Sequence, residues 1–352
     1  MWHSTSDNSL VDSRGRILFF SLPRFISDIS QGNDCFICGA RPNTVPFNDE
    51  HVLPDWILRR YKLHDRIIML PSGTGFRYRE FKVPCCAECN SAMGDKFEKP
   101  ISEIFAKGPT AVKQELKDNG PWRLFCWMSL IFVKTHLKDK YLDFHRDRRR
   151  GEMKIGELHN WEELHHIHCV ARAFHTGCGL TPEVFGSLLV LPAKVRPHFE
   201  SFDYCDLSVA QTMLLRIDDT AIIAVFNDSQ AALSVYYEEL DKIGGPLSPL
   251  QVREIAVQLA GINIHLAERP RFSSDINLLS EEYRILGHRP EELRLGDWQH
   301  EIHGKIMHHI CKDMVVGTPD WEQVLENIKT GRYTFLVDSD GKFVHDHMEL
   351  AP

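Results

Sequence analysis

At 352 residues, of which 43% are apolar and 26% charged, the chain is long enough for two domains and apolar enough to bury a sizeable core. Its longest apolar run, residues 124–133, is about half as long as a bilayer span requires, and the apolar stretch near the N-terminus is broken by Pro23 and Arg24. We therefore expect no signal peptide, no membrane span and, since ten cysteines are too sparse for a disulfide scaffold, a cytoplasmic protein.

Charge is unevenly distributed along the chain. Residues 1–150 hold 24 Lys and Arg against 18 Asp and Glu, a net charge of +6, whereas residues 151–352 hold 17 against 31, a net charge of −14. The total of −8 argues against a nucleic-acid-binding protein, but the basic first half does not. The asymmetry favours a basic first half that carries the activity and an acidic second half with another role.

Two Cys-x-x-Cys pairs are the first elements that carry chemistry. Cys35 and Cys38 stand in CFICG, and Cys86 and Cys89 repeat the spacing in VPCCAECN. Together they supply the four thiolates of a closed structural zinc site. Cys85 is an alternative ligand, but only Cys86 keeps the spacer that turns backbone N–H groups toward the sulfurs. A redox pair is the competing interpretation, although redox chemistry would need one pair and a βαβ pattern.

The segment between the two pairs is 47 residues long, against about 15–20 in a plain zinc ribbon. It contains DEHVLPDW, residues 49–56, where Glu50 precedes His51. A single histidine is more often a surface or core residue than a catalytic one. The four-cysteine frame, with Asn90 directly after the last cysteine, favours catalysis here.

Residue patterns in this region predict two strands and a helix. Residues 44–52 are typical of a first strand, 53–70 of a short helical or irregular excursion, and 76–83 of a second strand with imperfect alternation. Residues 87–99 are predicted to form a helix that Pro100 stops. Asn90 would then lie near the helix start and point toward the end of the first strand.

The pattern CFIC, EHVLP and CAECNSAMGDKFE resembles the HNH, or ββα-metal, endonucleases, in the subgroup whose fold is clamped by zinc on four cysteines. The resemblance covers residues 35–98. It departs from the family at the second strand, which lacks the middle asparagine that usually orients the loop carrying the catalytic histidine. The fold class that it implies is α+β, with a zinc-stapled ββα-metal module followed by a larger α+β domain.

Phosphodiester hydrolysis needs an activated water, a counter-charge for the phosphate and help for the leaving oxygen. His51 is the expected general base, because an imidazole accepts a proton at neutral pH. Glu50 and the Asn90 side-chain carbonyl are the expected ligands of a catalytic Mg²⁺ or Mn²⁺. Glu98, two turns after Asn90, is a further ligand, a residue that orients His51, or a surface acid.

Basic residues around the expected site are candidates for contacts with the DNA backbone, because they flank it and alternate with tyrosines. The candidates are Arg59, Arg60, Arg77 and Arg79. Lys96 is a weaker candidate, since exposed helix lysines are common.

The rest of the chain has fewer functional signals. Residues 120–140 predict a buried helix, 165–178 a histidine-rich strand without a second metal site, 208–217 and 220–227 paired strands, 248–262 and 297–314 helices, and 332–346 a terminal hairpin.

We expect an N-terminal segment (1–32), a nuclease domain (33–110) and an accessory α+β domain (111–352). The predicted function is a metal-dependent DNA endonuclease, by analogy in restriction or anti-phage defence, whose accessory domain takes a protein partner or activating ligand. The alternative is a non-catalytic four-cysteine zinc module that binds nucleic acid or protein.

Overall fold

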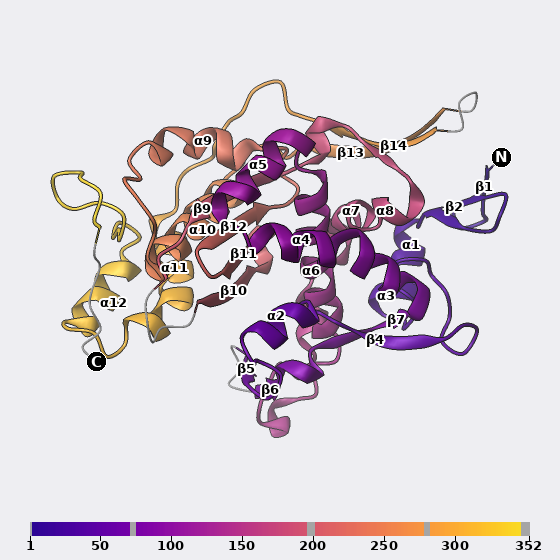
Figure 1. Cartoon of the computed structure of the whole chain (residues 1–352), viewed down its shortest axis with the longest axis horizontal. Coiled ribbons are helices and arrows are strands. Elements are labelled where there is room, and N and C mark those ends of the chain that lie inside the picture. Colours follow the sequence, from indigo (N-terminus) through magenta and orange to yellow (C-terminus); the bar gives the residue numbers. More distant parts are fainter. Residues whose placement is uncertain (1, 71–74, 196–200, 278–281, 346–352) are drawn as a thin grey trace. The chain divides into compact units, whose positions relative to one another are not determined.

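The protein, seen here as a computed structural model, is described over residues 2–70, 75–195, 201–277 and 282–345 (Figure 1). It is a mixed α+β protein, as predicted, and it divides into two compact units. Unit 1 comprises Met1–Glu103, Trp122–Thr181 and Phe272–Leu286; unit 2 comprises Ile104–Pro121, Pro182–Arg271 and Gly287–Pro352. The expected continuous segments 33–110 and 111–352 do not coincide with these boundaries, because residues 122–181 belong with the unit that contains the cysteine pairs.

The elements of unit 1 include four small sheets, of strand orders β1-β2-β3, β4-β7, β5-β6 and β13-β14-β8, and a set of helices. In chain order they are β1 (Trp2–Ser4), β2 (Leu10–Asp12), β3 (Ile17–Phe19), α1 (Leu22–Arg24), η1 (Phe25–Ser30), β4 (Phe47–His51), α2 (Asp55–Arg60), β5 (Ile67–Met69), β6 (Gly75–Arg77), η2 (Tyr78–Glu80), β7 (Lys82–Cys86), α3 (Ala87–Met93), η3 (Gly94–Glu98), α4 (Lys99–Phe105), α6 (Trp122–Asp139), η4 (Arg148–Arg150), η5 (Ile155–Leu158), α7 (Trp161–Ala171), α8 (Ala173–Thr176), β8 (Gly179–Leu180), β13 (Arg271–Asn277) and β14 (Glu282–His288). The ends of α4, β13 and β14 reach into unit 2.

Helix α6 forms the core of unit 1. Its residues from Leu124 to Leu137 are all buried, as a helix that is apolar nearly all round must be. It packs against β7, α7 and η3. The prediction of a buried helix at residues 120–140 is confirmed.

The second strand of the expected hairpin is displaced along the sequence. The chain turns at Tyr78–Glu80, where Phe81 N donates to Tyr78 O (3.0 Å), so residues 76–83 do not form one strand. Instead β6 pairs with β5, and β7 pairs antiparallel with β4. The imperfect alternation across residues 76–83 reflects this turn.

The predicted helix stop at Pro100 is wrong. α3, η3 and α4 follow one another without a break, and η3 is a wide turn in which Lys99 N donates to Gly94 O, five residues back. A proline breaks a regular helix because it lacks an N–H and crowds the carbonyl four residues earlier. The wide turn directly before Pro100 relieves both conflicts.

The histidine-rich strand predicted at residues 165–178 is also wrong. α7 spans Trp161–Ala171, and the side chain of Asn160 caps it by accepting from Glu162 N (3.2 Å). Leu164, Ile167 and Ala171 are among its buried residues, which is helical spacing. The alternation of His166 and His168 was a weaker signal than this apolar period.

Unit 2 is built on an antiparallel sheet of order β10-β11-β12-β9, with helices packed against it. Its elements are α5 (Pro109–Asn119), η6 (Pro182–Val184), β9 (Ser187–Pro192), β10 (Phe202–Leu207), η7 (Ser208–Ala210), β11 (Thr212–Ile217), β12 (Thr220–Val225), α9 (Ala231–Leu240), α10 (Pro249–Ile264), α11 (His300–Val315) and α12 (Trp321–Lys329). The predicted strand pair β11–β12 and the predicted helices α10 and α11 are confirmed. The terminal hairpin is reduced to a turn with one bridge, between Val337 and Phe343.

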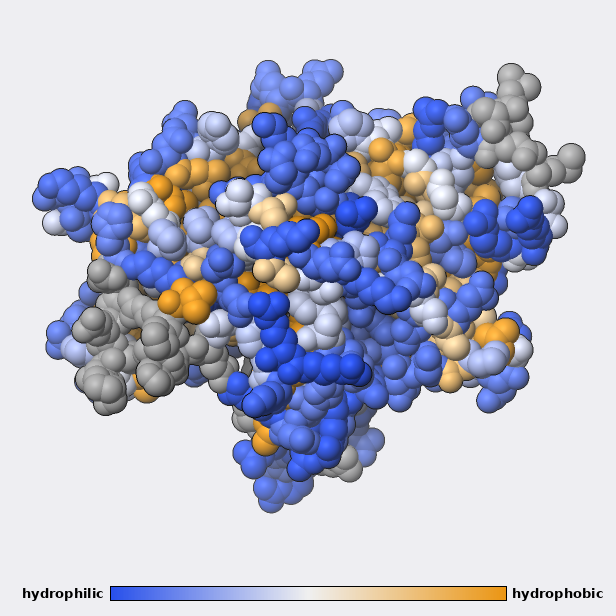
Figure 2. All heavy atoms as spheres, in the orientation of Figure 1, coloured by the Kyte–Doolittle hydropathy of each residue, from blue (hydrophilic) through white to orange (hydrophobic). Residues whose placement is uncertain are grey.

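The two central strands of the sheet in unit 2 are buried on both faces. Every residue of β11 and β12 is buried, and α10 and α9 contribute the apolar residues that cover one face. The molecular face in Figure 2 is mainly hydrophilic, with separate apolar patches. Among the described residues, no helix combines the length and apolar composition that crossing a membrane requires.

Candidate functional site

Four cysteine sulfurs meet in unit 1. Cys35 and Cys38 lie in a turn closed by a hydrogen bond from Gly39 N to Cys35 O (2.8 Å), Cys86 ends β7, and Cys89 lies in the first turns of α3. All four Sγ atoms lie within 4.8 Å of one another. The two pairs therefore come together in one cluster that can hold a metal ion.

The geometry of the cluster fits zinc. A tetrahedral ion with Zn–S bonds of about 2.3 Å separates its sulfurs by about 3.8 Å, and the Sγ atoms of Cys38 and Cys86 are 3.6 Å apart. Cys89 N donates to Cys86 Sγ (3.5 Å), which is the contact that the two-residue spacer predicts. Cys85 Sγ lies 3.8 Å from Cys35 Sγ, but in the described chain it does not join the four that are mutually close.

Electrostatics of the thiols also favour a bound cation. The Cys38 thiol, followed by those of Cys85 and Cys89, lowers the pKa of Cys35 by hydrogen bonding. Hydrogen bonding from Cys35 in turn raises the pKa of Cys38 to about 12 and raises that of Cys89 further. The Cys35 thiolate thus forms readily, and its negative charge opposes deprotonation of the neighbouring thiols. A dication bound by all four sulfurs would remove this electrostatic repulsion.

Helix α7 supports the turn that carries Cys35 and Cys38. His168 Nε2 lies 2.6 Å from Phe36 O, and Arg172 Nε donates to Ile37 O (2.8 Å). The guanidinium of Arg172 is fully buried and also donates to the backbone carbonyl of Ile17 (2.7 Å). His168 and Arg172 therefore support the cysteine turn.

Strand alternation separates Glu50 from His51. Neighbouring residues of a strand point to opposite faces of the sheet, and β4 pairs Glu50 with Val83 and His51 with Lys82. Glu50 and Val83 are buried, whereas His51 and Lys82 are partly exposed. The side chains of Glu50 and His51 therefore lie in different environments, one buried and one partly exposed.

Glu50 is bound to a buried lysine. Lys134 Nζ of α6 donates to Glu50 Oε1 (2.7 Å) and to the backbone carbonyl of His51 (2.7 Å), and the two side chains are 3% and 8% exposed respectively. This contact holds the end of β4. Burial raises the pKa of Glu98 to about 7, and Lys134, Glu50 and Asp55 lie within electrostatic range of its carboxyl group.

His51 faces two other potential ligands. The donor atoms of His51, Asp55 and His64 all lie within 4.8 Å of one another. Asp55, the first residue of α2, accepts from His64 Nε2 at 2.9 Å, and the rings of His51 and His64 meet edge to face. Burial, followed by the charge of Lys82, lowers the pKa of His51 and so favours its neutral form at pH 7.

The expected catalytic ligand set is not assembled around His51. Asn90 Nδ2 donates to Asn48 Oδ1 (3.1 Å), while Glu50 is bound to Lys134. Asn48 and Glu50 lie on the same face of β4, away from the His51 side chain. The structure instead brings Asp55 and His64 to His51, two residues that the sequence analysis missed.

The basic residues that were expected to contact DNA lie in several different environments. Arg59 is exposed and pairs with Asp55 Oδ2 (2.6 Å), and Arg79 is exposed and pairs with Asp65 (2.7 Å). Arg60 and Arg77 are exposed. Lys96 lies over the ring of Trp122, with its ammonium 5.2 Å from the ring centre.

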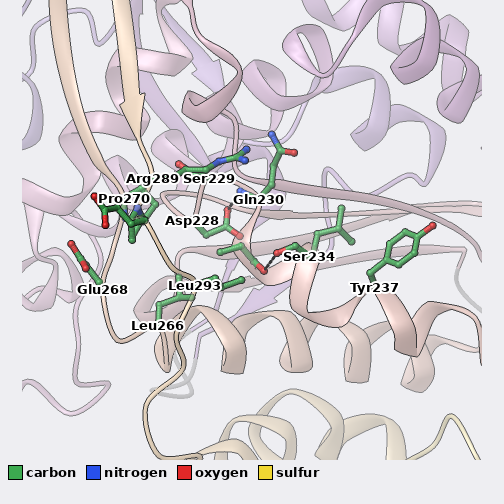
Figure 3. Close-up of a pocket in the computed structure, with 14 residues that line it drawn as sticks. Asp228, Ser229, Gln230, Ser234, Tyr237, Leu266, Glu268, Pro270, Arg289 and Leu293 are labelled. Atoms are coloured by element: carbon green, nitrogen blue, oxygen red, sulfur yellow. Dashed lines mark hydrogen bonds between the residues drawn. The ribbon is translucent and has the colours of Figure 1, made fainter.

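Unit 2 contains a separate cavity of about 550 Å³ at the start of α9 (Figure 3). Its charged lining residues are Asp228, Glu268, Arg289 and Glu291. The Asp228 carboxylate accepts from Ser187 Oγ (2.6 Å) and from the backbone amides of Ser187 and Ala232, so it holds the turn before α9. This cavity adds no residue to the candidate site.

The chain matches no known protein family and no curated protein sequence, and its fold matches no solved structure. Functional argument therefore rests on the residues of the site. Two signals in the sequence point to the Glu50–Lys134 contact: strand alternation turns Glu50 away from His51, and a lysine inside an apolar helix needs an anionic partner.

Proposed function

We propose that unit 1 is a zinc-stapled phosphodiester hydrolase that cuts DNA with the help of a second, divalent ion. The observation that carries this proposal is the partly exposed His51 at the end of β4, with Asp55 and His64 beside it. The scaffold fits the proposal, since β4, β7 and α3 form a strand pair and a helix clasped by four cysteines. This is the arrangement that the resemblance to HNH endonucleases implies.

In this proposal Asp55 and His64 hold the divalent ion. Their donor atoms are 2.9 Å apart, which is the separation of two adjacent ligands at about 2.0–2.1 Å from one ion. One carboxylate oxygen and one imidazole nitrogen suit Mn²⁺ or another transition ion better than Mg²⁺. A bound ion would supply positive charge to the phosphate and the leaving oxygen.

His51 acts as the general base. Its depressed pKa keeps the ring neutral near pH 7, and its outward position lets it take a proton from a water beside the scissile phosphate. Lys134 fixes the backbone of His51 by donating a hydrogen bond to its carbonyl oxygen, and Glu50 holds Lys134 in place. Glu50 is thus a positioning residue in this account and not an ion ligand.

The test is cleavage of supercoiled plasmid by the zinc-loaded protein, with Mg²⁺, Mn²⁺ or no added divalent ion. We expect cutting only with an added ion. Asp55→Asn and His64→Ala should raise the ion concentration for half-maximal rate by about tenfold or more, the usual scale for loss of a metal contact. Asp65→Asn, next to His64, is the matched control and should leave that concentration unchanged.

Two results would contradict the proposal. Equal ion dependence in the Asp55→Asn and Asp65→Asn proteins would remove Asp55 from the site. A protein that binds zinc and nucleic acid but cuts with none of the ions would support the non-catalytic zinc module.

A further inference from the structure

A groove of about 650 Å³ runs along the outer face of the β4–β7 pair in unit 1. Phe47, Asp49, Lys82 and Pro84 of the two strands form its floor, because these residues alternate outward. The remaining lining residues come from neighbouring segments and are Asn33, Pro42, Arg79, Glu80, Lys138 and Tyr141.

The groove leads to the proposed catalytic residue. Lys82 is paired across the strands with His51, and both side chains lie on the outward face. The charge of Lys82 contributes to the lowered pKa of His51, which places the two groups within electrostatic range. A strand bound along this face would therefore pass the His51 imidazole.

Two ammonium groups of the groove have no ion-pair partner among the described residues. Neither Lys82 nor Lys138 lies within ion-pair distance of a carboxylate in the described part of the chain, although Asp49 and Glu80 lie within electrostatic range of Lys138. Burial lowers the pKa of Lys138, because its ammonium is partly removed from water. A phosphate at this position would give the two ammonium groups a direct ion-pair partner.

An aromatic ring stands beside these cations. Tyr141 is 41% exposed, and the ammonium of Lys138 lies 5.8 Å from its ring centre. Its hydroxyl donates to Asn33 Oδ1, which fixes the ring at the edge of the groove. A fixed, exposed ring next to lysines is the combination with which proteins bind single strands, since bases stack on the ring and phosphates meet the cations.

We propose that this groove binds an unpaired stretch of a polynucleotide strand, with phosphates on Lys82 and Lys138 and a base on Tyr141. Its link to cleavage rests on the proposed function, because the groove delivers the strand to His51. Unpaired nucleotides are the class favoured here because a base inside a duplex cannot stack on a side chain.

Binding is measured with the full-length, zinc-loaded protein and a fluorescent oligo(dT) probe at about 50 mM salt without added divalent ion. We expect the double variant Lys82→Gln/Lys138→Gln to bind at least about tenfold more weakly. Its salt dependence should also fall by about 1.4 in log–log slope, for two lost phosphate contacts. Lys113→Gln/Lys117→Gln, which changes the same charge on the exposed face of α5, is the matched control and should bind like the unmodified protein.

Stacking is tested separately at Tyr141. Tyr141→Leu should weaken oligo(dT) binding by about fivefold or more, the scale of one stacked base. Tyr141→Phe keeps the ring and should restore binding. Zinc content and the unfolding transition of each variant show whether it is folded.

The outcomes separate this proposal from the proposed function. If the lysine double variant binds like its control, or if a duplex of equal length competes as well as oligo(dT), the groove proposal is overturned even when plasmid is cut. If binding falls as expected and no ion supports cutting, the groove stands and the hydrolase proposal fails.

Discussion

Replacing Lys134 by methionine tests the buried contact that holds the end of β4. Methionine occupies a similar volume without a charge, so the change leaves the buried Glu50 carboxylate without its partner. Removal of one partner of a buried ion pair costs about 3–5 kcal/mol. We expect the free energy of unfolding of unit 1 to fall by that amount. The double variant Glu50→Gln/Lys134→Met removes both charges and should recover most of the loss.

The assay is urea unfolding of the zinc-loaded protein, followed by tryptophan fluorescence. Lys138→Met, one helical turn later, is the control, because Lys138 is partly exposed and has no carboxylate partner at hydrogen-bond distance. The Lys138→Met substitution should lower the free energy of unfolding by less than about 1 kcal/mol. The reasoning would be refuted if Lys134→Met cost no more than this control, or if the double variant were no more stable than Lys134→Met.

Three further predictions concern the zinc cluster, the acid near Lys134 and the support of the cysteine turn. Cys38→Ser or Cys89→Ser should abolish stoichiometric zinc in metal analysis and unfold the turn, whereas Cys85→Ser should retain zinc; equal zinc in all three would contradict the cluster. The folded-state pKa of Glu98, about 7, is above its ordinary 4.5, so its contribution to stability is complete below about pH 4.5 and is lost as the pH rises through 7. Between pH 5 and 8 the wild type should therefore lose up to about 3 kcal/mol relative to Glu98→Gln in urea unfolding, and parallel pH profiles would argue against the shift. Arg172→Met leaves three buried carbonyls without their donor and should cost about 2–5 kcal/mol, with faster zinc release to a chelator; unchanged release would show that α7 does not support the turn.

Local signals in the sequence were sufficient for part of the site. The spacing of the cysteine pairs predicted the cluster, and it also selected Cys86 over Cys85, because the geometry of a Cys-x-x-Cys turn depends on neighbouring residues alone. The strand at Phe47–His51 and the helix after Cys86 were predicted for the same reason. The burial of α6 was predicted because a helix that is apolar on all sides is stable only inside the protein.

Other parts of the site depend on contacts between distant segments. Lys134 is 84 residues from Glu50, and no local pattern pairs them. Asp55 and His64 lie inside the predicted excursion, but their meeting with His51 depends on how α2 and the following turn fold back. Glu50 and Asn90 do not meet the His51 side chain, because neighbouring residues of β4 point to opposite faces of the sheet.

The measurement that tests the central claim most directly is the rate at which His51→Ala relaxes supercoiled plasmid, compared with the wild type and with His3→Ala, a change at an exposed histidine of β1. All three proteins are zinc-loaded and receive the same divalent ion. If His51 is the general base, His51→Ala should be slower by at least about 10²-fold, with zinc content and unfolding unchanged, and His3→Ala should match the wild type. Relaxation by His51→Ala at the wild-type rate would show that the phosphodiester chemistry, if present, lies elsewhere in the chain.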